Sequence, residues 1–451
     1  MPLEDLVRWA DAAGIELHGI RPHAFPGKGT GVIATRDIKK GEVVLSAPTE
    51  AIHCLDTIPT SVRSRLEEAA QGASTSRLSL HGLLAAALFL DDDQGHVKAK
   101  GSTAFDKTAW ASCAPTIGSF RDGLPLLWPE AVQELVPDPV AVIVQKQMRK
   151  LDSDWAVVQD ILTSSQSTLP QAGAGSHDLR DQYTHAWLLI NSRTFYNLTA
   201  STERYPHDER LALIPLADLF NHAPSPGTIS KPGRGPMSVS FSEEGYTITA
   251  RRPVAAGEEV CISYGEHSND FLLAEYGFFF ASSEPGSEHN GGNPYDSISL
   301  GDAIAPLLTA AQKASVVQAF RQMTAASDED ADEADSNGAG TLVGCVISLA
   351  EGKGTKIMLS PRVQVALSVL LDKNTDVASA GWAPCRITDN DLVRLLHRLL
   401  ESMQGFSRKN VETLRVLADE NGETSSSASL LMRRWQQIDK TATICLGMLP
   451  G

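Results

Sequence analysis

The stretches ADLFNH at residues 217–222 and GEEVCISYG at 257–265, followed by NDFLLAEYGF at 269–278, form the most informative pattern in the chain. The first holds an Asn-His pair. The second ends in Tyr-Gly after an apolar run typical of a strand, and the third holds another Tyr-Gly followed by Phe. Each pair is common alone, so the information lies in their order within one segment.

Size and composition indicate a soluble protein of more than one domain. A chain of 451 residues is too long for a single hydrophobic core, so we expect two or three domains. The longest apolar run, residues 83–90, is much shorter than the ~20 residues that span a bilayer. The first residues show no basic region followed by an apolar one. We therefore expect no membrane partner and a cytoplasmic and/or nuclear location.

The formal net charge is 39 − 55 = −16. This sign argues against nucleic acid as the main partner and favours a basic protein partner, because an acidic surface steers cations. The alternative is that the charge only maintains solubility. Six cysteines stand far apart with no Cys-x-x-Cys pair, so we expect reduced thiols and no metal. We also expect a monomer.

The pattern along the chain alternates between helical and strand-like regions. Residues 1–20 predict a short helix, and residues 27–45 predict strand, turn and strand. From about residue 58 to 183 the pattern is helical, including an apolar helix over 79–90 and another over 140–161. Short strands return between 213 and 280.

The last part of the chain predicts mainly helices. Residues 282–292 are rich in breakers and predict a linker, and the acidic stretch 327–340 predicts a disordered loop. The final helix should bury one stripe, formed by Leu431, Trp435, Ile438, Ala442 and Cys445.

Four stretches together resemble the Rubisco large-subunit methyltransferase class of SET proteins. They are GTGVIATRDI at 29–38, residues 110–135, INSRTF at 190–195, and the segment 213–280. The resemblance implies an α+β fold: a β-rich SET domain with a knot-like C-terminal segment, a helical insert, and an all-α C-terminal substrate-binding domain. The implied regions are an N-terminal helix with the first part of the SET domain (1–57), the insert (58–182), the second part of the SET domain (183–281) and the C-terminal domain (294–451).

The resemblance also implies S-adenosylmethionine as cofactor and assigns roles to particular residues. Tyr264 would be catalytic and would contact the substrate, and Phe195 would line the substrate channel. The implied cofactor-binding residues are Lys28, Gly29, Thr30, Arg193, Asp218, Asn221, His222, Tyr276 and Phe278.

Several of these residues have simpler interpretations. The run GTGVIA at 29–34 also fits a dinucleotide fingerprint, but no strand precedes it and no helix follows it. Asp218 and His222 could mimic a metal pair, but no third ligand lies nearby in the sequence. Arg193 could be an exposed arginine, and the aromatic residues could be ordinary core.

We therefore predict a methyltransferase that acts on a lysine of a non-histone protein substrate. A protein-histidine methyltransferase on the same fold is one alternative, and a catalytically silent SET-like adaptor that binds a partner protein is another. Phe195 favours lysine, because a phenyl ring can line the channel of a lysine stem but cannot orient an imidazole by hydrogen bonding.

Overall fold

A computed structural model describes most of the chain. The described residues are 2–26, 29–60, 62–64, 66, 78–90, 105, 107–163, 176–224, 235–242, 245–280, 292–325, 342, 344–350, 356–371, 389–420 and 425–450. Among them, no helix is both long enough and apolar enough to cross a membrane. The chain forms two compact units. Unit 1 comprises Met1–Phe120, Lys146–Ser225 and Gly233–Gly265; unit 2 comprises Arg121–Gln145, Pro226–Pro232 and Glu266–Gly451.

Unit 1 begins with a helix that is shorter than predicted. Helix α1 (Pro2–Ala12) buries Leu6 and Ala10, and the chain then turns at Gly14, whose φ of +81° favours glycine. The prediction of helix up to residue 20 is wrong beyond this turn, because strands β1 (Glu16–Leu17) and β2 (Ile20–Phe25) follow. β2 pairs antiparallel with β3 (Gly29–Ala34).

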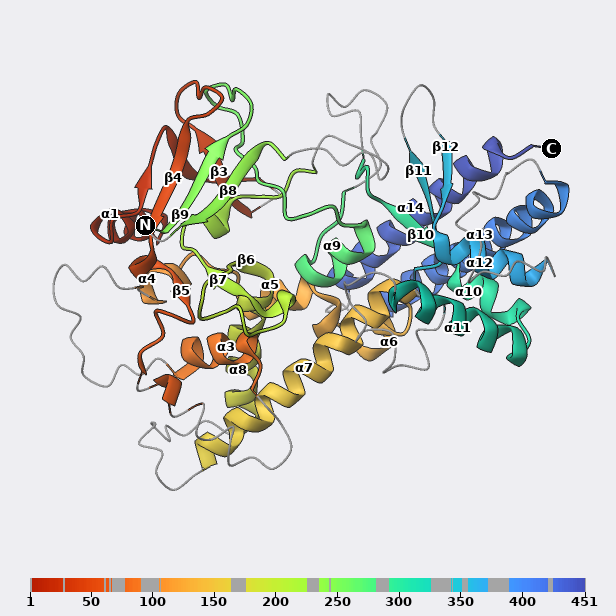
Figure 1. Ribbon diagram of the computed structural model, residues 1–451, viewed down its shortest axis with the longest axis horizontal. Helices are drawn as coiled ribbons and strands as arrows, with labels where there is room; N and C mark the ends of the chain where they lie inside the picture. The colour runs from red at the N-terminus through yellow and green to blue at the C-terminus, as the bar shows by residue number, and fades with distance from the viewer. Residues whose placement is uncertain are drawn as a thin grey trace. The chain divides into compact units, whose positions relative to one another are not determined.

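Two further antiparallel sheets complete the β structure of unit 1 (Figure 1). The larger has the order β1-β4-β9-β8, with β4 (Val43–Pro48), β8 (Met237–Ser242) and β9 (Gly245–Ala250). The smaller has the order β5-β7-β6, with β5 (His53–Cys54), β6 (Thr194–Tyr196) and β7 (Leu211–Leu213). The return of short strands after residue 213 is thus confirmed.

The helices of unit 1 match the predicted helical region. α3 (Leu80–Leu90) is nearly fully buried and packs against α8 (Ser176–Arg193), as Figure 1 shows. α4 (Lys107–Ala111) packs on α1. α5 (Ile117–Gly123) and α7 (Asp138–Thr163) each contribute residues to both units. The 3-10 turns are η1 (Thr49–Ala51), η3 (His207–Glu209) and η4 (Ala217–Leu219).

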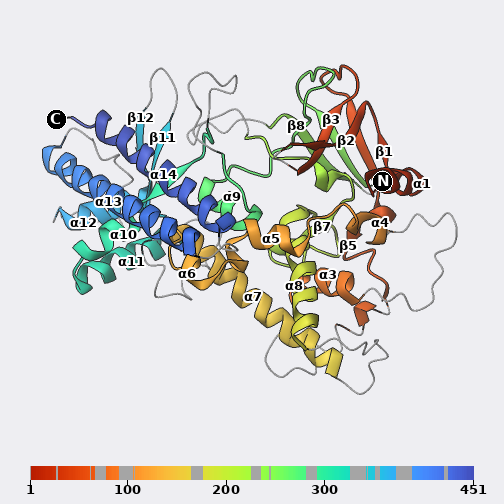
Figure 2. The same ribbon diagram turned by 180° about the vertical axis from the view of Figure 1, so that it is seen from behind.

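Unit 2 is mostly helical. Its helices are α6 (Glu130–Gln133), α9 (Asn269–Tyr276), α10 (Gly301–Ile304), α11 (Ala310–Ala325), α12 (Pro361–Leu370), α13 (Asn390–Glu420) and α14 (Ser425–Met448), with 3-10 turns η2 (Pro125–Leu127) and η5 (Ala305–Leu307). α13 and α14 pack along each other (Figure 2). All five residues of the stripe predicted on the final helix are buried, which confirms that prediction.

The all-α description of the C-terminal region is wrong in one respect. A three-stranded antiparallel sheet lies within it, with the order β10 (Ser297–Ser299), β11 (Val346–Ala350) and β12 (Lys356–Leu359). Strands of three to five residues are too short for their periodicity to be distinguished from that of a buried helix. The predicted disordered loop and nearly all of the predicted linker lie outside the described residues.

A buried ion network holds α9, the start of β10 and α14 together in unit 2. Arg434 has no exposed side-chain surface; its Nε lies 2.7 Å from Oδ1 of Asp270 and its Nη1 lies 2.9 Å from Oδ2 of Asp296. Burial alone would lower the pKa of Arg434, but the charges of the two aspartates outweigh it and raise that pKa above its ordinary value. Arg434 therefore keeps its charge.

Candidate active site

The segment between β7 and η4 changes direction at an unusual residue. Leu216 has φ +67° and ψ −36°, and it is the one residue other than glycine with a positive φ among those described. Its side chain is buried. Such a conformation costs energy in a bulky residue, so the surrounding packing must hold it. The bend leads directly into η4 and the ADLFNH stretch.

Asp218, in η4, is the centre of a buried polar group in unit 1. Its side chain is fully buried, and its Oδ2 accepts hydrogen bonds from Nη1 of Arg193 and from Nε1 of Trp110, each at 3.0 Å. The backbone oxygen of Asp218 accepts a second bond from the same Nη1, at 2.9 Å. Burial raises the pKa of Asp218, while Arg193 and Trp110 act in the opposite direction.

Arg193 keeps part of its guanidinium available. It is the last residue of α8, and 20% of its side chain is exposed. Its hydrogen bonds all run from Nη1, so Nη2 makes none with any described residue. A guanidinium fixed at one nitrogen can still receive an anion at the other, and a carboxylate suits its geometry. Arg193 is therefore no ordinary surface arginine.

Tyr264 is joined to the ADLFNH stretch by both its backbone and its side chain. Its hydroxyl donates to the carbonyl oxygen of Phe220 at 2.8 Å, and its backbone N–H donates to Nδ1 of His222 at 3.0 Å. The two rings stack at a centroid distance of 5.0 Å. Two backbone hydrogen bonds also join these stretches. The N–H of Ile262 donates to the carbonyl oxygen of Asn221, and the N–H of Ala223 donates to that of Ile262. The first two stretches thus lie side by side.

The environment of Tyr264 fixes its protonation state. Burial raises the pKa of Tyr264 to about 12, with the charge of Arg193 acting in the opposite direction and that of Asp218 in the same direction. The phenol therefore keeps its proton near neutral pH.

Asn221 connects this group to β3. Its Nδ2 donates to Oε1 of Glu259 at 2.8 Å. A Cβ atom added to Gly31 would lie 2.6 Å from that same Nδ2, so only glycine fits there without displacement. β3 also contacts η4. Gly29, with φ +76°, and the half-buried Thr30 begin this strand, whereas Lys28 lies outside the described residues.

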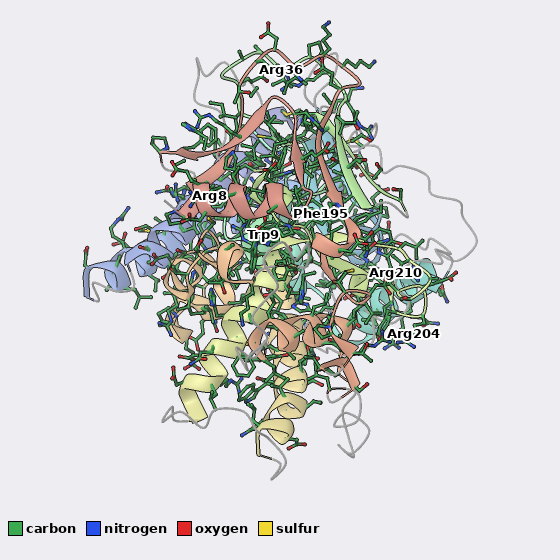
Figure 3. The ribbon with its side chains drawn as sticks, turned by 90° about the vertical axis from the view of Figure 1, so that its left-hand side faces the viewer. Arg8, Trp9, Arg36, Phe195, Arg204 and Arg210 are labelled. Carbon is green, nitrogen blue, oxygen red and sulfur yellow. The ribbon has the colours of Figure 1, made fainter. Side chains whose placement is uncertain are left out.

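Phe195 lies two residues after Arg193, in β6. Its ring lies 5.2 Å from that of Tyr246 in β9, measured between centroids, and it is half-buried among the strands of unit 1 (Figure 3). Its neighbour Tyr196 is 44% exposed, as expected where successive side chains of a strand point to opposite faces. Part of the Phe195 side chain therefore stays accessible, two residues after Arg193 in the chain.

Tyr276 and Phe278 belong to unit 2. Tyr276 ends α9, Gly277 caps that helix in the left-handed conformation, and the ring of Phe278 follows at 6.3 Å from that of Tyr276. The backbone of Gly123 packs directly on Gly277 and leaves no room for a side chain at either residue. Because these two rings lie in the other unit, their predicted role in cofactor binding stays a prediction.

Three contributors were not predicted from the sequence. Trp110 was noted only as part of the insert, and Glu259 only as part of the GEEVCISYG stretch. Phe220 acts through its backbone carbonyl, which no side-chain pattern can reveal. Within the described residues, no group of three or more His, Cys, Asp or Glu could hold a metal ion.

The SET domain family model matches residues 29–265, which is more than half of the chain, and the protein therefore belongs to the SET domain family. The match begins at β3 and ends one residue after Tyr264, so it contains every contact described above for unit 1 between Arg193, Asp218, Asn221 and Tyr264.

Relatives and solved structures agree with this family. "SET domain-containing protein 4" of Mus musculus is 28% identical over 290 residues, covering 61% of this chain and 57% of that protein. "Ribosomal lysine N-methyltransferase set11" of Schizosaccharomyces pombe is 24% identical over 61% of each chain, and "Actin-histidine N-methyltransferase" of Canis lupus familiaris is 25% identical over 61% of this chain and 42% of that protein. The chain thus spans less than two thirds of the length of these relatives.

The crystal structure of the SET domain of LSMT bound to MeLysine and AdoHcy superposes with a TM-score of 0.51. It is 16% identical and covers 100% of this chain and 93% of that chain. At this identity the likeness shows the fold, which confirms the predicted SET architecture with its helical regions. The knot-like threading of the C-terminal segment stays a prediction.

Proposed function

We propose that this protein is an S-adenosylmethionine-dependent protein methyltransferase. The observation that supports it most is the arrangement of Arg193 and Tyr264 around Asp218 in a SET domain: a guanidinium with an available nitrogen beside a buried, protonated phenol. The relatives named above include methyltransferases of protein lysine and of protein histidine.

The residues present suit this cofactor. When bound, it supplies a methyl group on a positively charged sulfur. Its amino-acid end carries a carboxylate, to which Nη2 of Arg193 would donate a hydrogen bond. Gly29, beside which an added Cβ would meet no atom within 4 Å, allows a ligand to approach the start of β3 closely. Gly31 leaves room for the amide of Asn221, which would contact the cofactor from the ADLFNH stretch together with His222. The side chains of Thr30, Tyr276 and Phe278, with Lys28, complete the proposed set.

Tyr264 would act by orienting the substrate amine. With a pKa of about 12 it is not a base near neutral pH, and its proton is directed at the Phe220 carbonyl. What the phenol oxygen offers an amine is therefore its lone pairs, as a hydrogen-bond acceptor. Methyl transfer requires a neutral amine aligned with the sulfur–carbon bond, so catalysis would rest mainly on alignment. The carbonyl of Phe220 would hold the phenol in place.

The proposed target is a lysine of a protein substrate. Phe195, two residues after Arg193 and half-buried against Tyr246, offers an apolar wall and no hydrogen bond. An apolar wall suits the aliphatic stem of lysine, and it also favours the neutral amine over the cation. An imidazole would need its second ring nitrogen oriented by a polar group.

The test uses the whole protein with isotope-labelled S-adenosylmethionine and a cell extract, followed by mass spectrometry of the labelled protein. We expect methyl groups on lysine. Methyl groups on histidine with none on lysine would contradict the lysine assignment and favour the histidine alternative.

A binding measurement separates the enzyme from the adaptor. Calorimetry with S-adenosylhomocysteine should give a micromolar dissociation constant, about −8 kcal/mol. Arg193→Gln should weaken this binding strongly. Arg210→Gln should not, because Arg210, labelled in Figure 3, donates to the carbonyl oxygens of Tyr205 and Glu203. No detectable binding by the folded wild-type protein would favour the adaptor.

We also propose that the helical C-terminal region offers part of the protein-substrate surface. Phe406 and Val416 on α13 are apolar and exposed. Replacing both by Ser should reduce methylation of the protein substrate without changing the affinity for S-adenosylhomocysteine. Val239→Ser, an equally exposed apolar residue on β8, is the matched control. Unchanged methylation by the double variant would contradict this role.

A further inference from the structure

One residue of the helical insert donates to the same carboxylate oxygen as the arginine of the site. Trp110, in α4, is 1% exposed, and its indole Nε1 donates to Oδ2 of Asp218 at 3.0 Å. The same oxygen accepts a hydrogen bond from Nη1 of Arg193, also at 3.0 Å. One carboxylate oxygen thus joins two donors that come from α4 and from the end of α8.

The indole of Trp110 is itself fixed by a cluster of rings. Phe105 lies 5.9 Å from Trp110 between centroids, and it also contacts His53 at 5.2 Å and Trp9 at 6.3 Å. Trp9 projects from α1, where Figure 3 labels it. Turning the indole would displace this cluster, so the direction of its N–H is set by the packing of α1 and α4.

The carboxylate of Asp218 needs such support. It is fully buried, and its other oxygen, Oδ1, has no hydrogen-bond partner among the described residues. Burial favours the protonated form of a carboxyl group, and a protonated Asp218 would lose the charge that holds Arg193. An indole N–H can only donate, so it stabilises the ionised carboxylate and fixes its rotation.

We propose that Trp110 is a positioning residue: through Asp218 it holds Nη1 of Arg193 so that Nη2 meets the carboxylate of the cofactor. The inference deepens the proposed function and rests on it. It also gives the side chain of Asp218 an indirect role, because both donors to its Oδ2 belong to the protein. Trp110 itself touches neither the reacting atoms nor the cofactor in this scheme.

The experiment compares two probes that differ at one group. They are S-adenosylhomocysteine and its carboxamide, in which the carboxylate is replaced by a neutral amide. The wild-type protein should prefer the carboxylate, and Arg193→Gln should lose that preference. Trp110→Phe keeps an aromatic ring but removes the N–H. It should reduce the preference about tenfold, as expected for losing one hydrogen bond to a charged group, with little change for the carboxamide.

The control is a second tryptophan with the same kind of contact in unit 1. Trp187 is fully buried, and its Nε1 donates to Oδ2 of Asp154 at 3.1 Å. Trp187→Phe should leave the preference unchanged. An equal loss for both probes in Trp110→Phe, or the same loss of preference in Trp187→Phe, would overturn the inference, because either result describes general damage to the fold.

Two further outcomes are distinguishable. If Trp110→Phe does not fold, Asp218→Asn, which is isosteric, breaks the same chain of contacts and should also lose the preference; retention of the preference would overturn the inference. If the folded wild-type protein binds neither probe, the proposed function itself fails and the inference fails with it. Binding of both probes without any preference in the wild type overturns the inference alone.

Discussion

The hydroxyl of Tyr264 donates to the carbonyl oxygen of Phe220 across 2.8 Å, although 44 residues separate the two in the chain. The backbone N–H of Tyr264 donates a hydrogen bond to Nδ1 of His222, in the same segment as Phe220. The phenol is thus oriented by the segment that also carries Asp218 and Asn221. Any role of Tyr264 in a reaction depends on this orientation, because burial keeps the group protonated.

Tyr264→Phe should abolish most methyl transfer while leaving cofactor affinity largely intact. The variant keeps the ring stacked on His222 but removes the oxygen that would accept a hydrogen bond from the amine. It should also cost about 1 kcal/mol of stability, since the bond to Phe220 is lost. Turnover with the labelled cofactor and calorimetry with S-adenosylhomocysteine check the two parts.

The matched control for this variant is Tyr183→Phe. Tyr183 is fully buried in unit 1, and, like that of Tyr264, its hydroxyl donates to a backbone carbonyl, that of Gly82, at 3.5 Å. We expect normal turnover in the control. Normal turnover in Tyr264→Phe as well would mean that catalysis takes place elsewhere.

Gly31→Ala should weaken cofactor binding and lower stability. The new Cβ would lie 2.6 Å from Nδ2 of Asn221 and 2.9 Å from the ring of Phe25, so it must displace the amide from Glu259. Overpacking of this kind costs about 1–3 kcal/mol. Calorimetry with S-adenosylhomocysteine and thermal unfolding would measure the two effects.

Gly118→Ala is the control for Gly31→Ala. A Cβ at Gly118, in α5, would meet only Oγ1 of Thr116 at 3.6 Å, which is an ordinary contact. Replacing glycine by alanine inside a helix should leave binding unchanged and raise stability by about 0.5–1 kcal/mol. If Gly31→Ala binds as tightly as the wild type, the position of the Asn221 amide does not matter for the cofactor.

The sequence predicted a group of residues that lie together in unit 1, because the SET stretches carry side chains of recognisable chemistry. Arg193, Asp218, Asn221, His222 and Tyr264 were all predicted, and the structure brings them together. The sequence pattern could not show which hydrogen-bond partner each of these side chains has. The bond from Asp218 to Trp110 spans 108 residues, and such a separation leaves no periodic signal.

In unit 2 the sequence predicted helices but not what holds them together. Arg434 is the tenth residue of α14, and Asp270 lies 164 residues earlier. Nothing local marks either one as buried, since charged residues at these positions normally face water. The short strands β10 to β12 were missed for a similar reason: their pairing is decided by contacts across the chain.

Arg434→Met should destabilise unit 2 by about 3–5 kcal/mol, because it leaves Asp270 and Asp296 without their counter-ion. Hydrogen–deuterium exchange of peptides from α9 and α14 would measure the loss locally. Arg408→Met is the control: its pair with Asp439 is 3.4 Å long and its side chain is 67% exposed. We expect a change within about 1 kcal/mol there. Similar small effects in both variants would contradict a structural role for the network.

The same network bears on any truncation at Gly292. Removing residues 293–451 would delete Arg434 and leave Asp270, which is buried on α9, without its partner. A shortened protein could therefore lose activity because α9 unfolds, independently of any substrate surface. Point variants of exposed residues on α13 are the cleaner way to examine the C-terminal region.

The final prediction concerns acid stability and a histidine outside the site. His81, in α3, is 3% exposed; its ring stacks on Trp187 at 4.0 Å, and its Nε2 donates to the Trp187 carbonyl at 2.9 Å. Burial, assisted by the charge of Lys150, lowers the pKa of His81 to about 3, against an ordinary value near 6.5. The folded protein therefore keeps this imidazole neutral.

The sign of the pH effect follows from these two pKa values. Between pH 6.5 and 3 the unfolded chain binds a proton at His81 that the folded protein does not, so the free energy of unfolding falls as the pH falls. One such group gives a slope of at most about 1.4 kcal/mol per pH unit, and above pH 6.5 the slope disappears. His81→Gln keeps an N–H donor but removes the titration, so its stability curve should be flatter by this amount in that window. Urea unfolding at a series of pH values measures the curves, with His207→Gln, an exposed histidine of unit 1, as control. A His81→Gln curve parallel to the wild type would show that the buried imidazole contributes nothing to the acid sensitivity of the fold.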